Sequence, residues 1–543
     1  MNPQACDSPA RVAAARRARD RLSRPVRDKE SPPARREVLM DLLAILAAWL
    51  VVAFALGRGT IVTAYDVFRD MSYAQAILDG HLWQDPSIPG LRAWYPPGNA
   101  LAFAGLSALT RISPVDLYAT SLYWLGWINP VVLYLLVRSG WGRATALVSL
   151  AVVPLGSFWW FTHVAMPMAS VQGVALGLLA LFVWTTHRDR GLHRAALTGG
   201  LLGMAIWHHP ICGAMALGSI LVHGGAAALL PAERGDPVAS RFELAGKAAL
   251  AGGVGLLLSV PALLSQLALP RTNAAPHHWF APELHDPRFA FHLHAPLILP
   301  LGLFGLWLAA RHWRDDGWLV AYFGIGLVGQ LAGYLGHDAG WRIAWALPHE
   351  FQWHEQLALM IAAAIAIVRL STSLAAGLRG ARRVTARLTA IATLLALSAA
   401  PALFSLPVAD SYLMRLDDRW RATRAMARWI RTNTPLESVF ACPPEVGFFL
   451  SGLTGRKVIA LPPGHMNPAA DVEARFSDLG EMLSTRDEQV FLRLAARYGV
   501  THLLVTPPAG EARAIYARWE SLEPANLTDS TALVYRIRWS AVR

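Results

Sequence analysis

The segment from Tyr65 to Gly98 reads YDVFRDMSYAQAILDGHLWQDPSIPGLRAWYPPG and follows the first apolar stretch long enough to cross a membrane. It contains four aspartates and ends in a Pro-Pro pair followed by glycine. Asp66 and Asp70 are four residues apart, so both carboxylates project from one face if the segment forms a helix. Two carboxylates on one face repel each other unless a cation lies between them. The candidates for this cation are Arg69, a divalent metal and a substrate.

The composition is typical of a polytopic membrane protein. Of the 543 residues, 54% are hydrophobic and only 16% are charged, which excludes a soluble protein. The net charge of +12 is concentrated in Lys and Arg clusters between apolar runs, a pattern that indicates cytoplasmic loops and not nucleic-acid binding. The three cysteines, Cys6, Cys212 and Cys442, are far apart in the sequence and imply neither a disulfide framework nor a cysteine-based metal site.

The apolar runs predict about eleven membrane spans. A run of about 20 residues crosses the ~30 Å apolar core of a bilayer. Candidate spans begin near Val38, Val115, Ala144, Pro167, Ala195, Ile211, Lys247, Leu293, Gly317, Trp353 and Arg387. The short apolar segment from Asn99 to Leu109 is expected to be re-entrant or juxtamembrane, because a full crossing there would place the basic loops on opposite sides.

This threading predicts three parts. Residues 1–37 form a basic, disordered cytoplasmic arm, and the apolar run that follows is an uncleaved anchor. Residues 38–407 form the transmembrane domain, whose first outer loop is 58–114. Eleven crossings from a cytoplasmic N-terminus place residues 408–543 outside the cell (inner) membrane, on the same side as the aspartate loop. The expected localisation is therefore multi-pass, with an extracytoplasmic, periplasmic C-terminal domain.

Residues 408–543 differ in character from the rest, with frequent charges and three Pro-Pro pairs, and they predict a small soluble α/β domain. Helices are expected at Arg419–Arg431, Glu488–Tyr498 and Glu511–Glu520, and extended segments at Ser438–Ala441, Lys457–Ala460, His502–Thr506 and Ala532–Ile537. The segment from Gly452 to Lys457 lacks the spacing of a phosphate-binding loop and is predicted to be a turn before a strand.

The four loop aspartates are not equivalent. Asp66 and Asp70 are candidate catalytic groups, although solvated carboxylates are also expected at a membrane surface. Asp79 precedes Gly80 and is predicted to lie at a helix C-terminus, where a polar residue needs no other role. Asp85 precedes Pro86 and is predicted to begin a turn.

Histidines and one arginine form the other half of the expected site. His208 and His209 stand between two apolar segments, where they could bind a divalent metal or a phosphate with the aspartates, or simply hydrogen-bond to the loop backbone. Arg342 is predicted to lie in an outer loop, where its guanidinium could bind the phosphate of a lipid-linked substrate. Alternatively, it only marks the end of a helix. His163 and His337 are predicted to face outward and are further candidates for substrate binding. No zinc-binding histidine spacing, nucleophile elbow or dinucleotide fingerprint occurs in the sequence.

The first loop resembles the GT-C superfamily of membrane glycosyltransferases, which includes protein O-mannosyltransferases, aminoarabinose transferases and oligosaccharyltransferases. The matching features are Asp66 and Asp70 after the first span, then Tyr73-Ala74, Gly80, and finally Tyr95-Pro96-Pro97 before a short apolar helix. The sequence departs from the family pattern in lacking an adjacent Asp-Glu pair and in having no carboxylate near His163.

The resemblance implies transfer of a sugar from a polyprenyl-phosphate donor to an acceptor on the outer face, with inversion. Asp66 is expected to be the base and Asp70 its partner or a ligand of a possible Mg or Mn ion. Arg342, His208, His209, Tyr73, Tyr95, His163 and His337 are expected to bind substrate. The alternatives are a transporter or flippase of a lipid-linked intermediate, which would carry charges within its spans, and a non-catalytic envelope assembly protein.

Overall fold

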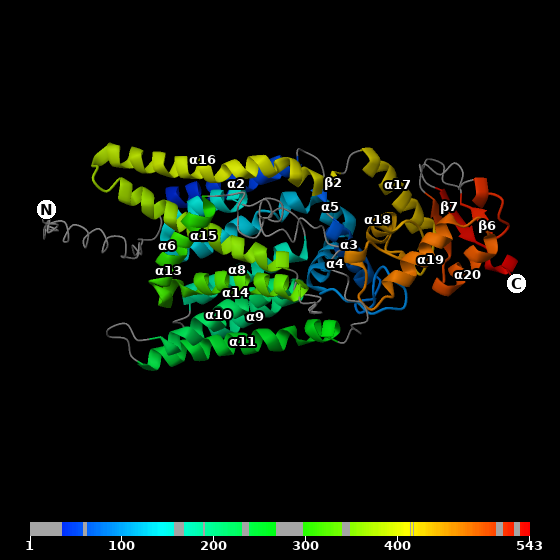
Figure 1. Cartoon of the computed structure of the whole chain (residues 1–543), viewed down its shortest axis with the longest axis horizontal. Coiled ribbons are helices and arrows are strands. Elements are labelled where there is room, and N and C mark those ends of the chain that lie inside the picture. Colours follow the sequence, from blue (N-terminus) through cyan, green and yellow to red (C-terminus); the bar gives the residue numbers. More distant parts are fainter. Residues whose placement is uncertain are drawn as a thin grey trace, which may run out of the picture.

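The structure is a computed structural model that describes residues 35–57, 62–63, 65–156, 168–187, 191–230, 238–267, 297–338, 348–412, 414–415, 418–505, 514–525 and 533–542. Figure 1 shows an elongated molecule with a bundle of long helices at one end and a smaller α/β domain at the other. Three short helices of the first loop lie between these two parts: α3 (Tyr65–Leu78), α4 (Gly98–Thr110) and α5 (Pro114–Trp124).

The bundle helices run roughly along the long axis of the molecule (Figure 1). They are α2 (Arg35–Gly57), α6 (Ile128–Gly156), α8 (Ala169–His187), α9 (Leu192–His208), α10 (Pro210–Leu229), α11 (Val238–Leu267), α13 (Ile298–Ala310), α14 (Trp313–Asp338), α15 (Pro348–Leu374) and α16 (Gly380–Tyr412).

The chain is an integral membrane protein. Within the described residues, six helices are long and apolar enough to cross a membrane, and they lie in α6, α8, α10, α11, α14 and α15. The number rises to seven if α4 and α5 are counted as one broken span. The eleven predicted crossings are therefore not confirmed. One reason is length, because α9 has 17 residues and α13 has 13, fewer than the roughly 20 that a perpendicular crossing needs.

The segment after the Pro-Pro pair is a short helix, as expected. Helix α4 contains 13 residues, so it is about 20 Å long and shorter than the apolar core of a bilayer. The chain then bends by 102° into α5. Ser113 caps α5 by accepting a hydrogen bond from the backbone N–H of Asp116 at 3.2 Å. The two helices therefore form an angled pair beside α3.

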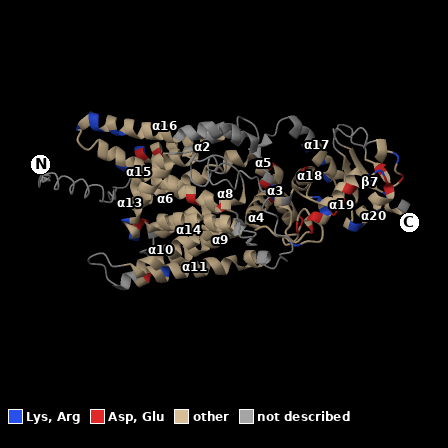
Figure 2. Cartoon of the chain, viewed as in Figure 1, with Lys and Arg blue, Asp and Glu red and all other residues tan. Residues whose placement is uncertain are grey.

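One of the basic clusters, from Arg138 to Arg143, coincides with a break inside α6. Gly142 interrupts the helix with φ 81° and ψ 174°, a conformation that favours glycine. Arg138 and Arg143 on either side donate to Asp41 of α2 at 2.7 and 2.6 Å, and Asp41 is only 3% exposed. A carboxylate buried in the bundle is thus neutralised by two arginines. Figure 2 shows that further Lys and Arg residues gather at the end of α16 far from the α/β domain.

The α/β domain is built on a five-stranded mixed sheet with the order β4-β3-β5-β7-β6. Strand β3 is parallel to β4 and β5, whereas β7 is antiparallel to β5 and β6. The strands are β3 (Val439–Ala441), β4 (Lys457–Val458), β5 (His502–Val505), β6 (Leu522–Pro524) and β7 (Leu533–Ile537), and the helices are α17 (Asp418–Asn433), α18 (Pro444–Thr454), α19 (Val472–Ser484) and α20 (Glu488–Tyr498). The sequence did not predict α18, α19 or β6, and only Ala514 to Tyr516 are helical in the described part of the expected helix at 511–520.

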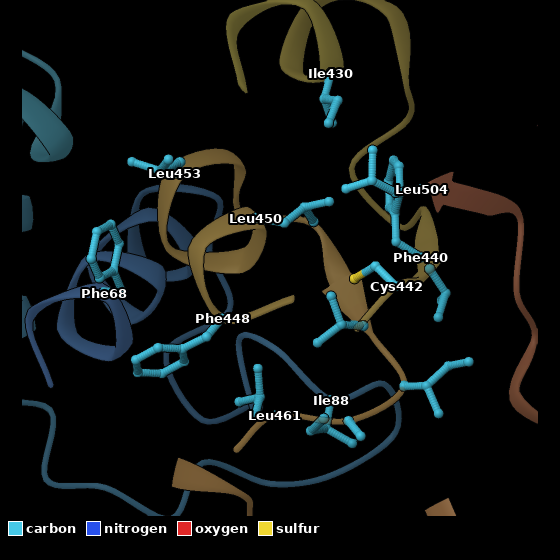
Figure 3. Close-up of a cluster of buried hydrophobic side chains, with 14 of the residues drawn as sticks. Phe68, Ile88, Ile430, Phe440, Cys442, Phe448, Leu450, Leu453, Leu461 and Leu504 are labelled. Carbon is cyan, nitrogen blue, oxygen red and sulfur yellow. The ribbon is translucent and has the colours of Figure 1, made fainter. Parts of the chain in front are cut away.

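The first loop and the α/β domain share one hydrophobic core. Figure 3 shows Phe68 of α3 beside Phe448 and Leu453 of α18, with Ile88 of the loop beside Leu461. The ring of Phe68 lies 4.8 Å from that of Phe449 in an edge-to-face contact. In addition, β1 (Val62–Thr63) pairs antiparallel with β2 (Met414–Arg415). This pairing joins the first loop to the segment that directly precedes the α/β domain. The loop that carries the aspartates is therefore fixed to the C-terminal domain.

Candidate active site

Helix α3 presents Asp66, Arg69 and Asp70 within its first two turns. Their spacing of three and four residues brings the side chains together on one face. Arg69 donates from Nη1 to Asp66 Oδ1 at 3.1 Å, and from Nε and Nη2 to Asp70 Oδ1, both at 3.2 Å. Of the three candidates for the cation between the carboxylates, the structure selects Arg69.

The two aspartates differ in what they can reach. Asp70 is 1% exposed, and its second oxygen, Oδ2, accepts hydrogen bonds from Asn99 Nδ2 at 2.6 Å and from the backbone N–H of Ala169 at 3.2 Å. Its two oxygens therefore accept four hydrogen bonds, which is the usual capacity of a carboxylate. Burial raises the pKa of Asp70, and Arg69 opposes this shift. Asp66 has a side chain that is 41% exposed, so it is the one of the pair that can meet a substrate.

Tyr95 covers the guanidinium of Arg69. The Cζ atom of Arg69 lies 3.4 Å from the centre of the Tyr95 ring, the geometry of a cation–π contact. Burial lowers the pKa of Arg69, but Tyr95, Asp66 and Asp70 together raise it above its usual value, so the guanidinium stays charged. Arg69 is 7% exposed and acts within the site as a fixed positive charge.

Tyr73 holds the loop that carries Tyr95. Its hydroxyl oxygen accepts hydrogen bonds from the backbone N–H groups of Trp94 and Tyr95 at 3.1 and 3.2 Å. The side chain is 2% exposed, and burial raises the pKa of Tyr73, so the hydroxyl remains protonated. Tyr73 was expected to bind substrate; in the structure it positions the residue that covers Arg69.

Asp79 and Asp85 lie away from this cluster. Asp79 is exposed where α3 ends, and Gly80 follows in the left-handed conformation with φ 87°. Asp85 accepts hydrogen bonds at Oδ1 from the backbone N–H groups of Ser87 and Ile88, the geometry of an Asx turn. Its Oδ2 also accepts from Asn467 Nδ2 at 2.7 Å. This contact ties the loop to the α/β domain.

His465 reaches the site from the α/β domain. It ends the short 3-10 helix η3 (Pro463–His465), and its Nδ1 lies 3.3 Å from Asp66 Oδ1. Its ring stacks on that of Phe448 with centroids 4.5 Å apart. Burial lowers the pKa of His465 to about 4, although Asp66 acts in the opposite direction. The imidazole is therefore neutral near pH 7.

His209 extends the cluster toward the helix bundle. Its ring lies 6.5 Å from that of Tyr95 in an edge-on arrangement, and its Nε2 is 3.7 Å from Oε1 of Glu350 in the first turn of α15. The contacts thus form a row from Asp66 through Arg69, Tyr95 and His209 to Glu350. His208 does not join this row in the same way, because its Nδ1 is 2.9 Å from the backbone oxygen of Met204 in its own helix.

Comparisons with known proteins find the fold but no close relative. No protein-family profile matches the sequence. No curated protein matches it either. Among solved structures, archaeal oligosaccharyltransferase AglB from Archaeoglobus fulgidus, in complex with an inhibitory peptide and a dolichol-phosphate, aligns over 89% of this chain and 71% of its own. The TM-score is 0.56 and the identity is 12%.

Two further structures are similar over 93% of this chain. ArnT from Cupriavidus metallidurans bound to undecaprenyl phosphate aligns over 98% of its own length, with a TM-score of 0.53 and 14% identity. Arabinofuranosyltransferase AftD from Mycobacteria aligns over 40% of its own length, with a TM-score of 0.56 and 13% identity. The chain has the GT-C glycosyltransferase fold. The resemblance drawn from the first loop is thereby confirmed at the level of the fold.

Three residues predicted for the GT-C site cannot be placed by their side chains. Arg342 and His163 lie outside the described residues. His337 is in the last turn of α14, where the structure describes the backbone only. Of the other predicted residues, the structure brings Asp66, Tyr95 and His209 into one row of contacts. Asp70 binds Arg69 of this row, and Tyr73 supports Tyr95.

Asp66 and Asp70 were considered as ligands of a possible Mg or Mn ion. Their arrangement in the structure does not fit such an ion. All four acceptor positions of Asp70 are used by protein donors, and Arg69 places a positive charge between the carboxylates. In the part of the chain that the structure describes, no three His, Cys, Asp or Glu side chains are grouped to hold a metal ion. No step of the chemistry below is assigned to a metal.

Sequence reasoning missed His465, Asn99 and Glu350 as members of the cluster. Asn99 directly follows the Tyr-Pro-Pro-Gly turn, and this position was a usable signal. His465 and Glu350 gave no comparable signal. Nothing in their local sequence indicates that they approach α3, because the approach depends on how distant elements pack.

Proposed function

We propose that the protein is a membrane glycosyltransferase that moves a sugar from a polyprenyl-phosphate donor to an acceptor on the outer face of the cell membrane. The observation that carries the proposal is an exposed carboxylate, Asp66, held by a buried arginine where the helix bundle meets the α/β domain. The GT-C fold gives this site its context. The AglB and ArnT structures contain dolichol-phosphate and undecaprenyl phosphate, which suits a polyprenyl-linked donor here.

Asp66 acts as the general base. The acceptor attacks the anomeric carbon from the side opposite the phosphate, so the configuration inverts. A bond from the acceptor to the anomeric carbon forms, the bond from that carbon to the phosphate oxygen breaks, and the acceptor's proton passes to the Asp66 carboxylate. The polyprenyl phosphate leaves with the electron pair. Asp70 takes no proton in this scheme; it fixes Arg69, which in turn holds Asp66.

The phosphate group of the donor is assigned to the end of the row of contacts that is opposite Asp66. We assign His209 to the departing phosphate; Arg342, His163 and His337 remain candidates from the sequence, and the structure describes none of their side chains. Imidazole and guanidinium groups donate hydrogen bonds to phosphate oxygens. Tyr73 and His208 are assigned supporting roles, because their polar atoms contact backbone groups of the protein.

A transporter of a lipid-linked intermediate is the second candidate, and one feature favours it. The span within α15 is the most enclosed of the six, and it carries His354 and Glu355, which are 1% and 4% exposed. Ionisable groups buried in a membrane span are frequently functional. Charges within the spans are what a transporter would carry, so this feature needs a direct test.

The test uses the purified protein in nanodiscs with a panel of synthetic undecaprenyl-phosphate sugars. Membranes from a strain that lacks the gene supply the acceptor, and released undecaprenyl phosphate is measured by mass spectrometry. We expect release by the wild type and a loss of at least about 10²-fold in Asp66→Asn, because general-base assistance typically contributes 10²- to 10⁴-fold. Asp79→Asn is the matched control; it removes the same charge from the exposed end of the same helix and should retain full activity.

Two outcomes would count against the proposal. If Asp66→Asn releases undecaprenyl phosphate as fast as the wild type, the base assignment is wrong. If no donor is consumed, but the wild type in proteoliposomes moves the same donors between leaflets, the protein is a transporter.

A further inference from the structure

His465 is held in a defined position by the α/β domain. It lies in η3, in the connection between β4 and α19, and its side chain is 20% exposed. Its ring stacks on Phe448 with an interplanar angle of 26°. Phe448 belongs to α18, whose aromatic side chains also pack on Phe68 of α3. The same helix thus supports both His465 and the helix that carries Asp66.

His465 and Arg69 approach the same oxygen of Asp66. Arg69 Nη1 lies 3.1 Å from Oδ1 and His465 Nδ1 lies 3.3 Å from it. Arg69 donates a hydrogen bond to this oxygen and His465 contacts it, so the two contacts together restrict rotation of the carboxylate about its Cβ–Cγ bond. Arg69 belongs to α3 and His465 to the α/β domain, so the contacts of Asp66 come from both parts of the fold.

We propose that His465 is a positioning residue through which the C-terminal domain completes the transferase site, because the 3.3 Å contact of its Nδ1 with Oδ1 holds the Asp66 carboxylate in place. The inference rests on the proposed function, in which Asp66 is the base. His465 itself need not touch the substrate. A neutral imidazole with its proton on Nδ1 is the tautomer that can donate in this direction.

A purely structural role for His465 can be separated from this proposal, because the same domain contains a comparable histidine. His502 stacks on Phe440 with ring centroids 4.9 Å apart and an interplanar angle of 15°. Its Nδ1 contacts the Thr501 hydroxyl at 2.8 Å, within the sheet. His502 therefore reports the cost of losing a stacked histidine in this domain without a change at Asp66.

The test compares His465→Asn, His465→Gln and His502→Gln in the release assay described above. The Asn side-chain amide nitrogen is attached at the same carbon as Nδ1, whereas the Gln nitrogen stands nearer to the place of Nε2. Both replacements lose the stacking ring equally. We expect His465→Gln to lower kcat about tenfold or more with little change in KM for the donor. We expect His465→Asn to retain most of kcat, and His502→Gln to leave kcat unchanged.

The proposal is overturned if His465→Gln keeps the wild-type kcat, or if His465→Asn and His502→Gln lose as much kcat as His465→Gln. A thermal double-mutant cycle of Asp66→Asn with His465→Gln gives a readout that needs no activity. We expect the combined loss of Tm to be smaller than the sum of the two single losses, because both changes remove the same contact. Additive losses would refute the contact. If the wild type releases no undecaprenyl phosphate but the cycle shows coupling, the proposed function fails and the contact stands.

Discussion

Arg69 determines the chemistry available at the first loop. It is buried between two aspartates and under an aromatic ring, so it supplies the positive charge that keeps Asp66 and Asp70 close together. A guanidinium is suited to this place because its planar set of donors can serve both carboxylates at once. A divalent metal bound between the same oxygens would have to displace this guanidinium and the hydrogen bonds of Asp70.

This arrangement leads to a prediction about metal removal. We expect transfer by the wild type to be insensitive to EDTA, because Arg69 already provides the cation between the carboxylates. We expect Arg69→Gln to lose most of its activity and some stability, since loss of one partner leaves Asp70 buried without its ion pair, a change that typically costs about 3–5 kcal/mol. The measurements are undecaprenyl phosphate release with and without EDTA, and the Tm of the variant. A loss of wild-type activity in EDTA that Mg or Mn restores would falsify the assignment.

At the scale of the elements, the junction of α3 with α18 determines where the site residues lie. Gly452 is packed so closely on α3 that a Cβ atom there would lie 2.7 Å from the backbone oxygen of Phe68. Gln75 of α3 also donates from Nε2 to the backbone oxygen of Gly452. The helix that carries Asp66 and Arg69 is thus held against the α/β domain by backbone contact, which only glycine permits.

We therefore expect Gly452→Ala to lower both stability and transfer. Overpacking of this kind costs about 1–3 kcal/mol, and the displacement of α3 moves Asp66 relative to His465. Gly480→Ala in α19 is the matched control, because a Cβ there meets nothing within 4 Å. It should be neutral or stabilise the fold, since alanine is favoured over glycine within a helix. The measurements are Tm and the rate of release, and equal effects of the two changes would contradict the packing argument.

The sequence correctly predicted those helices whose bounds depend on a local pattern of residues. Helix α20 has the bounds expected from its apolar spacing, and Gly80 ends α3 as its sequence indicated. Helix α18 was missed because its sequence, PEVGFFLSGLT, is apolar on more than one face and contains two glycines. It is buried between the sheet and α3, so its pattern reflects two partners. The contact of His465 with Asp66 joins residues far apart in the chain, and no periodicity could reveal it.

At the scale of the whole molecule, α16 relates the site to the two sides of the membrane. It contains 33 residues and is about 50 Å long, so its length exceeds the ~30 Å apolar core of a bilayer, although it is not among the six helices that are also apolar enough to be spans. The N-terminus of α16 follows Arg379, and its first turn contains Arg382 and Arg383. Its C-terminus leads to β2 and the α/β domain (Figures 1 and 2). Because Lys and Arg are retained on the cytoplasmic side, this helix predicts an outer location for the α/β domain.

The orientation can be measured with single cysteines. We expect Glu481→Cys in α19 to react with a membrane-impermeant maleimide in intact spheroplasts, and Arg382→Cys in α16 to react only after permeabilisation. Both positions are exposed in the structure, so a difference in labelling reports the side of the membrane. The background is a chain in which Cys6, Cys212 and Cys442 are replaced by alanine. The opposite labelling pattern would place Asp66 and His465 in the cytoplasm, and the donor sugar would then have to be presented from that side.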